Sequence, residues 1–277
     1  MVFYEMLLIQ EKSKVLDTIN NAYKEFSRVA DLRLKTGESN VLEKASAANQ
    51  STQIAIQIKG LQKEFGLLQQ QLMLLTNSNE MLQPQAESYQ LESIALDTAA
   101  LAQHPYVMMQ LQQEQTAMAN TKLAQAQLLP ELLLGYNNMS IQDGTNTRSN
   151  RFNSVQLGIG IPIFAGAQKA RIRSAKTQEA IAKNESILAK KQWQTEMQDV
   201  YNQFLRNREI VMEFEHTAIK NAKSITSTLN RQLQNGEINY LEWTVLNQQA
   251  MTLKLAYLDA VKDLNNSIIQ LNYLLSK

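Results

Sequence analysis

The sequence predicts a mainly α-helical fold, made of two long antiparallel coiled-coil helical hairpins and one β-hairpin. Gly and Pro are scarce, at 9 and 4 of 277 residues, which favours long helices over a β-sandwich or an α/β enzyme. A short segment with a central Gly occurs twice, between stretches of heptad-spaced apolar residues. A further segment alternates strictly between apolar and small or polar residues, as a strand does.

The repeated segment marks two helical turns. Residues 36–43 read TGESNVLE and residues 235–242 read NGEINYLE, so that Gly, Glu, Asn, Leu and Glu coincide. A Gly can end a helix in the left-handed conformation, and an Asn three residues later can cap the next helix. We therefore interpret each copy as the tip of a helical hairpin.

Heptad spacing flanks both tips and places one hairpin at 1–76 (tip near 36–42) and the other at 165–277 (tip near 235–241). The same spacing also occurs in the core of soluble bundles. However, the stretch from Ala167 to Asn235 lacks Pro and Gly, and as one helix it would span roughly 100 Å, which favours an extended hairpin. The predicted seam residues are Val15, Ile19, Ala22, Phe26, Val29, Ala47, Ile54, Ile58, Leu61, Phe65, Leu68, Leu72, Leu75, Trp193, Val200, Phe204, Val211, Ala218, Ile225, Leu229, Tyr257, Val261, Leu264, Ile268, Leu271 and Leu275.

Between the hairpins we expect an irregular connector at 77–104 and a helix at 105–130. The connector is polar and is broken by Pro84, so short irregular helices are expected there. The dipeptide His104-Pro105 predicts a helix start, because Pro is favoured at the first helical position. This helix should run to about Leu129, where Pro130 follows.

The segment 131–164 predicts the β-hairpin. Residues 154–164 alternate strictly, which matches a membrane β-strand with its apolar face toward lipid. A soluble hairpin covering a helical core could show the same pattern, but two strands alone are marginal in water. No run of about 18 apolar residues predicts a transmembrane helix. The expected lipid-facing residues are Val155, Leu157, Ile159, Ile161 and Ile163.

Composition excludes several function classes. Lys and Arg number 27 against 26 Asp and Glu, a net charge of +1, so no nucleic-acid partner is expected. The chain has no Cys, and its two His, His104 and His216, lie far apart. We interpret His104 as a surface residue, and Met108, Met109 and Met118 as flexible core filler rather than a copper site. Without a nucleophile–base pair or a phosphate-binding loop, we expect no enzyme, no metal and no cofactor.

The order of the predicted elements resembles the TolC family of outer-membrane efflux channels. The residues that carry the likeness are 128–132 (LLPEL), 160–166 (GIPIFAG) and 236–242 (GEINYLE). The resemblance covers essentially the whole chain, and the order of the motifs is more specific than any one of them. It is strongest to the CusC/CzcC-like metal-efflux branch, including versions fused behind an inner-membrane RND-type pump.

The resemblance implies a passive exit duct for heavy-metal cations or small toxic compounds. In this family, two repeats per chain and three chains close one β-barrel in the outer membrane of a Gram-negative bacterium, with helices extending into the periplasm. The expected partners are two further copies in a homotrimer, a periplasmic adaptor, an inner-membrane RND-type pump and outer-membrane lipid. The alternative function is a soluble coiled-coil structural or adaptor protein without a pore. A membrane-fusion adaptor would need β-rich segments beside its hairpin, and none is visible.

The resemblance also implies that a strand pair, a helix and a signal peptide precede Met1. The sequence holds a full second repeat but only the tip hairpin of the first, and residues 1–14 lack the basic start of a signal peptide. We therefore expect this chain to be a truncated product, a product with a misannotated start, or the tail of a fusion. Three copies of it would offer six strands, whereas the resemblance implies a barrel of twelve.

The tips supply the remaining candidate residues. The resemblance implies that both tips dock the adaptor, unless they only shape the turns. It also implies that Glu43 and Glu242, six residues past the turn glycines, lie at the periplasmic entrance, although a second acidic residue usual there is not found. A solvated flanking charge is the alternative. The expected docking residues are Gly37, Glu38, Ser39, Asn40, Leu42, Gly236, Glu237, Ile238, Asn239 and Leu241.

Overall fold

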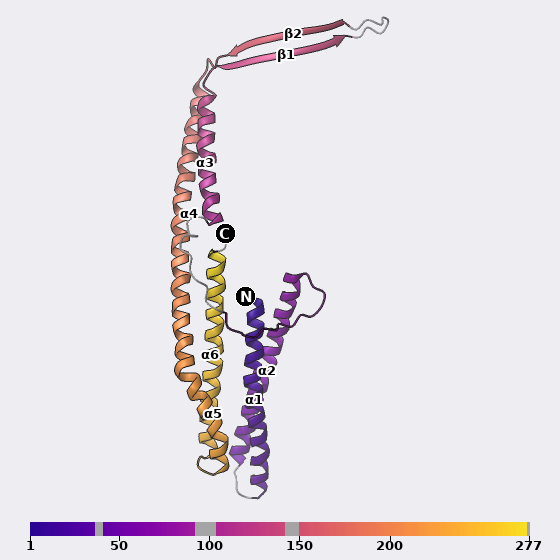
Figure 1. Ribbon diagram of the computed structural model, residues 1–277, viewed down its shortest axis with the longest axis vertical. Coiled ribbons are helices and arrows are strands. Elements are labelled where there is room, and N and C mark those ends of the chain that lie inside the picture. The colour runs from indigo at the N-terminus through magenta and orange to yellow at the C-terminus, as the bar shows by residue number, and fades with distance from the viewer. Residues whose placement is uncertain (37–40, 92–103, 142–149, 276–277) are drawn as a thin grey trace. The chain divides into compact units, whose positions relative to one another are not determined.

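The computed structural model describes residues 1–36, 41–91, 104–141 and 150–275, and it confirms the mainly helical fold class with one two-stranded antiparallel sheet (Figure 1). The chain divides into two compact units. One contains Met1–Leu96 and Met197–Ser276, and the other contains Asp97–Glu196. Among the described residues, no helix combines the length and the apolar character needed to cross a membrane.

The first helical hairpin consists of α1 (Val2–Lys35) and α2 (Val41–Thr76). Its predicted seam is buried at Ile19, Phe26, Ala47, Ile54 and Ile58. Burial then fades along α2. Ile9 of α1 and Leu61 of α2 line one groove. In antiparallel packing, the few residues of α1 before Ile9 do not reach far enough to cover the last turn of α2. The predicted seam residue Leu75 is accordingly 68% exposed.

The second hairpin consists of the end of α4 (Gly166–Glu213), a π-helical turn η2 (Phe214–Ala218), α5 (Ile219–Gln234) and α6 (Tyr240–Leu275). The predicted long helix is therefore helical from Gly166 to Gln234, with one π turn that the sequence did not reveal. Val211 is buried before this turn, whereas Ala222 and Leu229 are buried after it. The predicted seam residues Ala218 and Ile225 are only half-buried.

The described part of the connector corrects one expectation, because residues 77–91 form turns, bends and irregular chain without the short helices that were expected; residues 92–103 lie outside the described residues. Side chains satisfy much of its backbone instead. The amide of Asn265, on α6, accepts from the Leu91 N–H at 2.9 Å and donates to the Tyr89 carbonyl at 2.7 Å. Gln69 donates to the Leu82 carbonyl at 3.0 Å. Bonds of this kind replace the helical ladder that Pro84 would interrupt.

The second unit contains α3 (Pro105–Ala126), the first part of α4 and the β-hairpin. As predicted, α3 starts at Pro105, and it ends three residues before Leu129. His104 is half-buried rather than on the surface: its Nδ1 accepts from the Tyr106 N–H at 3.3 Å, and its ring stacks on Trp193 with centroids 3.8 Å apart.

The methionine expectation was wrong. Met108, Met109 and Met118 are exposed on α3 rather than packed in a core. The buried residues of α3 are Val107, Ala117 and Thr121. Met108 and Met109 lie on other faces of the helix, whereas Met118, three turns beyond Val107, lies at the edge of the buried face.

The β-hairpin pairs β1 (Glu131–Ile141) with β2 (Asn150–Gly160) in one unbroken register, from Glu131 opposite Gly160 to Ile141 opposite Asn150. β2 ends before Ile161 and Ile163, so these two expected strand residues lie outside the strand. Pro162 has no N–H to donate, and β1 begins only after Pro130, which ends the pairing.

Candidate functional site

The second tip is built by two standard helix-capping motifs. Gly236 has a φ of +72°; its N–H donates to the Leu233 carbonyl at 3.2 Å, and the Glu237 N–H donates to the Gln232 carbonyl at 2.9 Å. These two bonds form a Schellman motif, which explains the Gly. The predicted turn is therefore confirmed at this tip.

α6 then starts with a capping box between Asn239 and Glu242. The Asn239 side chain accepts from the Glu242 N–H, and the Glu242 carboxylate accepts from the Asn239 N–H, both at 2.9 Å. The sequence predicted the Asn cap but not the reciprocal bond, although Asn followed three residues later by Glu is its signature. Glu242 is exposed, so its carboxylate both caps α6 and charges the surface beside the tip.

Around this cap the tip presents apolar surface. Leu241 and Val245 are 66% and 65% exposed. Ile238 instead packs against the core of the unit. The exposed apolar side chains lie one turn apart on α6, on a surface that a partner helix could cover.

Part of the first tip lies outside the described residues, namely Gly37, Glu38, Ser39 and Asn40. Beside it, Leu42 is 78% exposed and Glu43 is half-buried. Asp31 pairs with Lys35 on its own helix and with Lys44 on α2. Hydrogen bonds from these two ammonium groups lower the pKa of Asp31 to about 2.

An aromatic cluster joins the two hairpins next to the tips, and the sequence analysis missed it. Phe26 stacks on Tyr240 with ring centroids 3.8 Å apart, and Tyr23 meets Trp243 edge-on at 5.2 Å. Trp243 Nε1 donates to Asn230 at 3.1 Å. Burial raises the pKa of Tyr23 to about 12. Pairs of aromatic residues three apart on both helices were the available signal, since such residues share a helix face.

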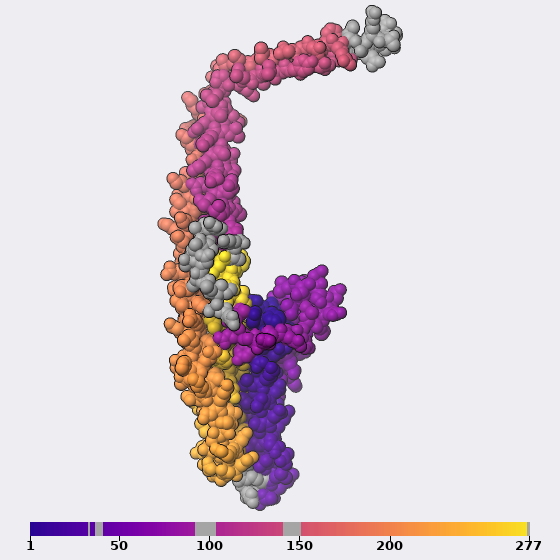
Figure 2. Space-filling model, viewed as in Figure 1, coloured from indigo at the N-terminus to yellow at the C-terminus, as the bar shows by residue number. Residues whose placement is uncertain are grey.

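The β-hairpin has one apolar face built from both strands. Leu132, Leu134 and Tyr136 lie directly opposite Ile159, Leu157 and Val155, and directly paired residues share a face. All six side chains are exposed, up to 82% for Leu157, and Figure 2 shows the hairpin surface in space-filling form. The three β1 residues were not among those predicted, although apolar residues occupy every second position there, at Leu132, Leu134 and Tyr136. The additional Leu133 on the other face interrupts the strict alternation seen in β2.

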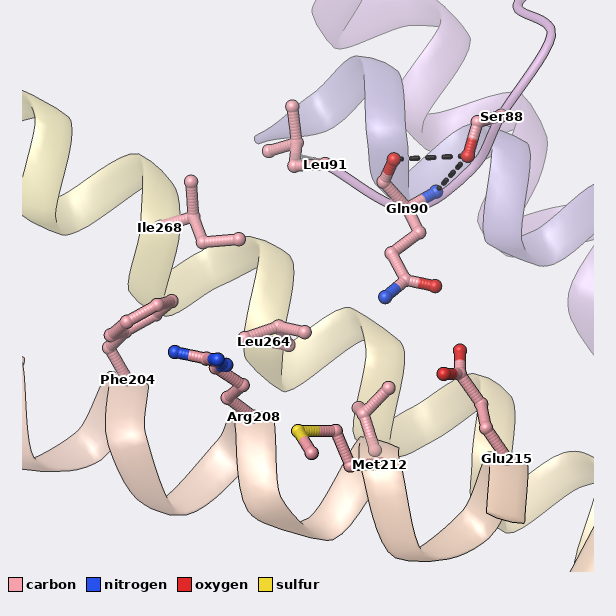
Figure 3. A pocket seen from close by; sticks show the side chains of 10 residues that line it. Ser88, Gln90, Leu91, Phe204, Arg208, Met212, Glu215, Leu264 and Ile268 are labelled. Atoms are coloured by element: carbon pink, nitrogen blue, oxygen red, sulfur yellow. Dashed lines mark hydrogen bonds between the residues drawn. The ribbon is translucent and has the colours of Figure 1, made fainter. Parts of the chain in front are cut away.

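A groove of about 520 Å³ lies in the first unit, between the connector, α4 and α6 (Figure 3). Phe204 and Leu264 form part of its buried floor, and Arg208 and Glu215 lie toward its two ends. Ser88 bonds the backbone of Gln90. The lining contains no nucleophile–base pair. In the described part of the chain, no three His, Asp or Glu residues come together as metal ligands.

Comparison with known proteins gives a family and a fold. The outer membrane efflux protein family matches residues 96–276. No curated protein sequence gives a significant match. Solved structures similar to 99% of the chain include CusC (TM-score 0.84, 21% identity), the CmeC outer membrane channel of Campylobacter jejuni (0.81, 17%) and the outer membrane protein VceC of Vibrio cholerae (0.83, 15%).

The chain spans 66%, 60% and 67% of the length of these three chains, respectively. At such identities the likeness concerns the fold, whereas the family match covers most of this sequence. The chain belongs to the outer membrane efflux protein family.

Proposed function

We propose that the protein is the outer-membrane channel component of a tripartite efflux system. It would act as a homotrimeric passive exit duct, supplied by a periplasmic adaptor and an inner-membrane RND-type pump. Its cargo would be heavy-metal cations or small toxic compounds, as in the metal-efflux branch. In this proposal 1–76 and 165–277 are the periplasmic hairpins, 77–104 the connector, 105–130 a further helix and 131–164 the membrane segment. The observations that carry the proposal are a capped helical tip and an exposed β-hairpin with a continuous apolar face, in one chain.

The membrane segment can be tested with a pair of adjacent substitutions. Val155, Leu157 and Ile159 would face lipid, continued by Ile161 and Ile163 beyond the strand. Leu157→Arg should cost about 2–4 kcal/mol near the bilayer midplane and should reduce insertion into outer-membrane vesicles, measured by protease protection. Gln156→Arg, on the opposite face, should insert normally. Equal insertion of the two variants would refute the assignment of faces.

The tips can be tested as the adaptor-docking surface. The proposed residues are Gly37 to Asn40 and Leu42 at one tip, and Gly236 to Asn239 and Leu241 at the other. Because the chain has no Cys, a photo-crosslinker on Glu237→Cys would be unique. It should capture the adaptor in cells, whereas Gln270→Cys, on α6 about 45 Å from the tip, should not. Capture only at Gln270 would move the docking surface away from the tips.

Glu43 and Glu242 are proposed as carboxylates of the periplasmic entrance. Three chains would bring six carboxylates together, and such acidic rings favour cations. Glu→Gln at both positions should weaken cation selectivity in planar-bilayer recordings. Gln can replace Glu in a capping box, so the cap on Asn239 should survive. The control is Glu→Gln at the exposed Glu64 and Glu209; equal selectivity in the two double variants would place Glu43 and Glu242 outside the pore.

A further inference from the structure

The apolar face of the β-hairpin ends abruptly. Toward the loop, Tyr136 opposite Val155 is the last apolar pair on this face. The next pairs on the same face are Asn138 opposite Asn153, and Ser140 opposite Arg151. An apolar face therefore changes into a polar one within a single pair, at an aromatic residue. Aromatic residues flank the apolar band of membrane strands in this way.

Hydrogen bonds order the polar pairs. Asn153 Oδ1 accepts from the Tyr136 hydroxyl at 3.0 Å and from Asn138 Nδ2 at 2.7 Å. Because the Asn153 oxygen takes both bonds, its own NH₂ group remains a donor. Together with the guanidinium of Arg151 and the hydroxyl of Ser140, the face beyond Tyr136 offers several donors and no carboxylate.

Arg151 is the one cation among residues 131–141 and 150–160, and Glu131 is the one anion. The register puts them at opposite ends of the hairpin, with Ser140 opposite Arg151. Nine residues of strand, at about 3.3 Å each, separate them by roughly 30 Å. This exceeds the screening length of about 8 Å in physiological salt. No carboxylate in the described part of the chain forms an ion pair with Arg151.

The depth of Arg151 follows if the apolar face lies in a membrane. Arg151 is eight residues from Ile159, the middle of the proposed lipid-facing stretch from Val155 to Ile163. Eight residues cover about 26 Å along the strand, or about 20 Å along the bilayer normal at a tilt of about 40°. The hydrocarbon core extends about 15 Å from its midplane. Arg151 would therefore lie at the level of the lipid headgroups.

We propose that Arg151, Asn153 and Ser140 form a binding site for the phosphate groups of outer-leaflet glycolipid (lipid A). The inference rests on the proposed membrane position of the hairpin, in which the helical end is periplasmic and the loop end is extracellular. Phosphate is the anion at that level, and the planar guanidinium binds it with two parallel hydrogen bonds. The amide of Asn153 and the hydroxyl of Ser140 supply further donors on the same face.

The test is lipid retention by the full chain after reconstitution. The protein is placed in phosphatidylethanolamine nanodiscs containing bis-phosphorylated lipid A, or phosphatidylglycerol at equal charge, and bound lipid is counted by native mass spectrometry. We expect the wild-type chain to retain lipid A in preference to phosphatidylglycerol. Arg151→Gln should weaken lipid A retention by about tenfold. Arg173→Gln, which removes the same charge from an exposed position on α4, should leave it unchanged.

Two outcomes would overturn the proposal: equal retention by Arg151→Gln and wild type, or equal retention of lipid A and phosphatidylglycerol. A spin label on Leu157→Cys, read in the same nanodiscs, separates this from failure of the proposed function. If the label is accessible to oxygen in lipid while lipid A retention does not depend on Arg151, only the headgroup site is wrong. If the label lies in water, the membrane position of the hairpin is wrong as well.

Discussion

Asn265 should be a disproportionately costly side chain to remove. It is 1% exposed, and its amide makes two backbone hydrogen bonds to the connector, with the Leu91 N–H and the Tyr89 carbonyl. Asn265→Ala leaves both backbone groups without this partner. A lost bond to a buried group costs about 1–3 kcal/mol. Because Tyr89 and Leu91 are half-buried, water can replace part of each bond, and we expect a total loss of about 2–3 kcal/mol.

The control is the neighbouring Asn266→Ala. Asn266 is half-buried and has no side-chain hydrogen bond within the described ranges. Both substitutions change helix propensity equally, so the difference between their urea-unfolding free energies isolates the two bonds. Amide exchange at Leu91 should accelerate in Asn265→Ala alone. Equal unfolding free energies, with unchanged exchange at Leu91, would refute the argument.

Two other predictions concern the tips. The pKa of Asp31 is lowered to about 2, so the pairing of Asp31 stabilises the fold above about pH 4 and is lost as the pH falls through 2. In chemical-denaturation titrations, the difference in unfolding free energy between wild type and Asp31→Asn should be constant above about pH 5 and should shrink toward pH 2. A difference that persists at pH 2 would contradict this. A Cβ added by Gly236→Ala would meet open space, but Gly236 has a φ of +72°. The substitution should therefore lower the free energy of unfolding by about 1–2 kcal/mol. Gly66→Ala, inside α2 and also in open space, should stabilise by about 0.5–1 kcal/mol in thermal unfolding; shifts of the same sign would count against a conformational origin.

Local chemistry accounts for what the sequence predicted correctly. The turn at Gly236, the cap at Asn239 and the helix start at Pro105 each depend on a few consecutive residues with restricted backbone conformations. The alternation in β2 likewise follows from the two-residue period of a strand. Such features need no knowledge of distant neighbours.

The features that the sequence left open depend on segments far apart in the chain. The contact of Phe26 with Tyr240 joins two hairpins, and the bonds of Asn265 to the connector span more than 170 residues. Met108 illustrates the converse, because helical spacing alone does not say which face of α3 is covered. For the candidate sites, the sequence predicted the position of the tip and the apolar residues of β2. It did not predict that Glu242 caps α6.

The π turn at Phe214–Ala218 acts as a phase correction in a long helix. From Val200 to Val211 the buried positions advance by alternating steps of four and three. Strict continuation through 214 and 218 would reach residues 221 and 228 in α5, whereas Ala222 and Leu229 are the buried ones. One additional residue wound into η2 absorbs this slip without breaking the helix. Deleting a single residue from η2 would turn every later side chain of α5 by about 100°, and Leu229 would leave the core. An insertion or deletion in this helix is therefore tolerated only where a π turn can take up the change in helical register. The length of the second hairpin and the direction in which the side chains of its tip point can then change independently.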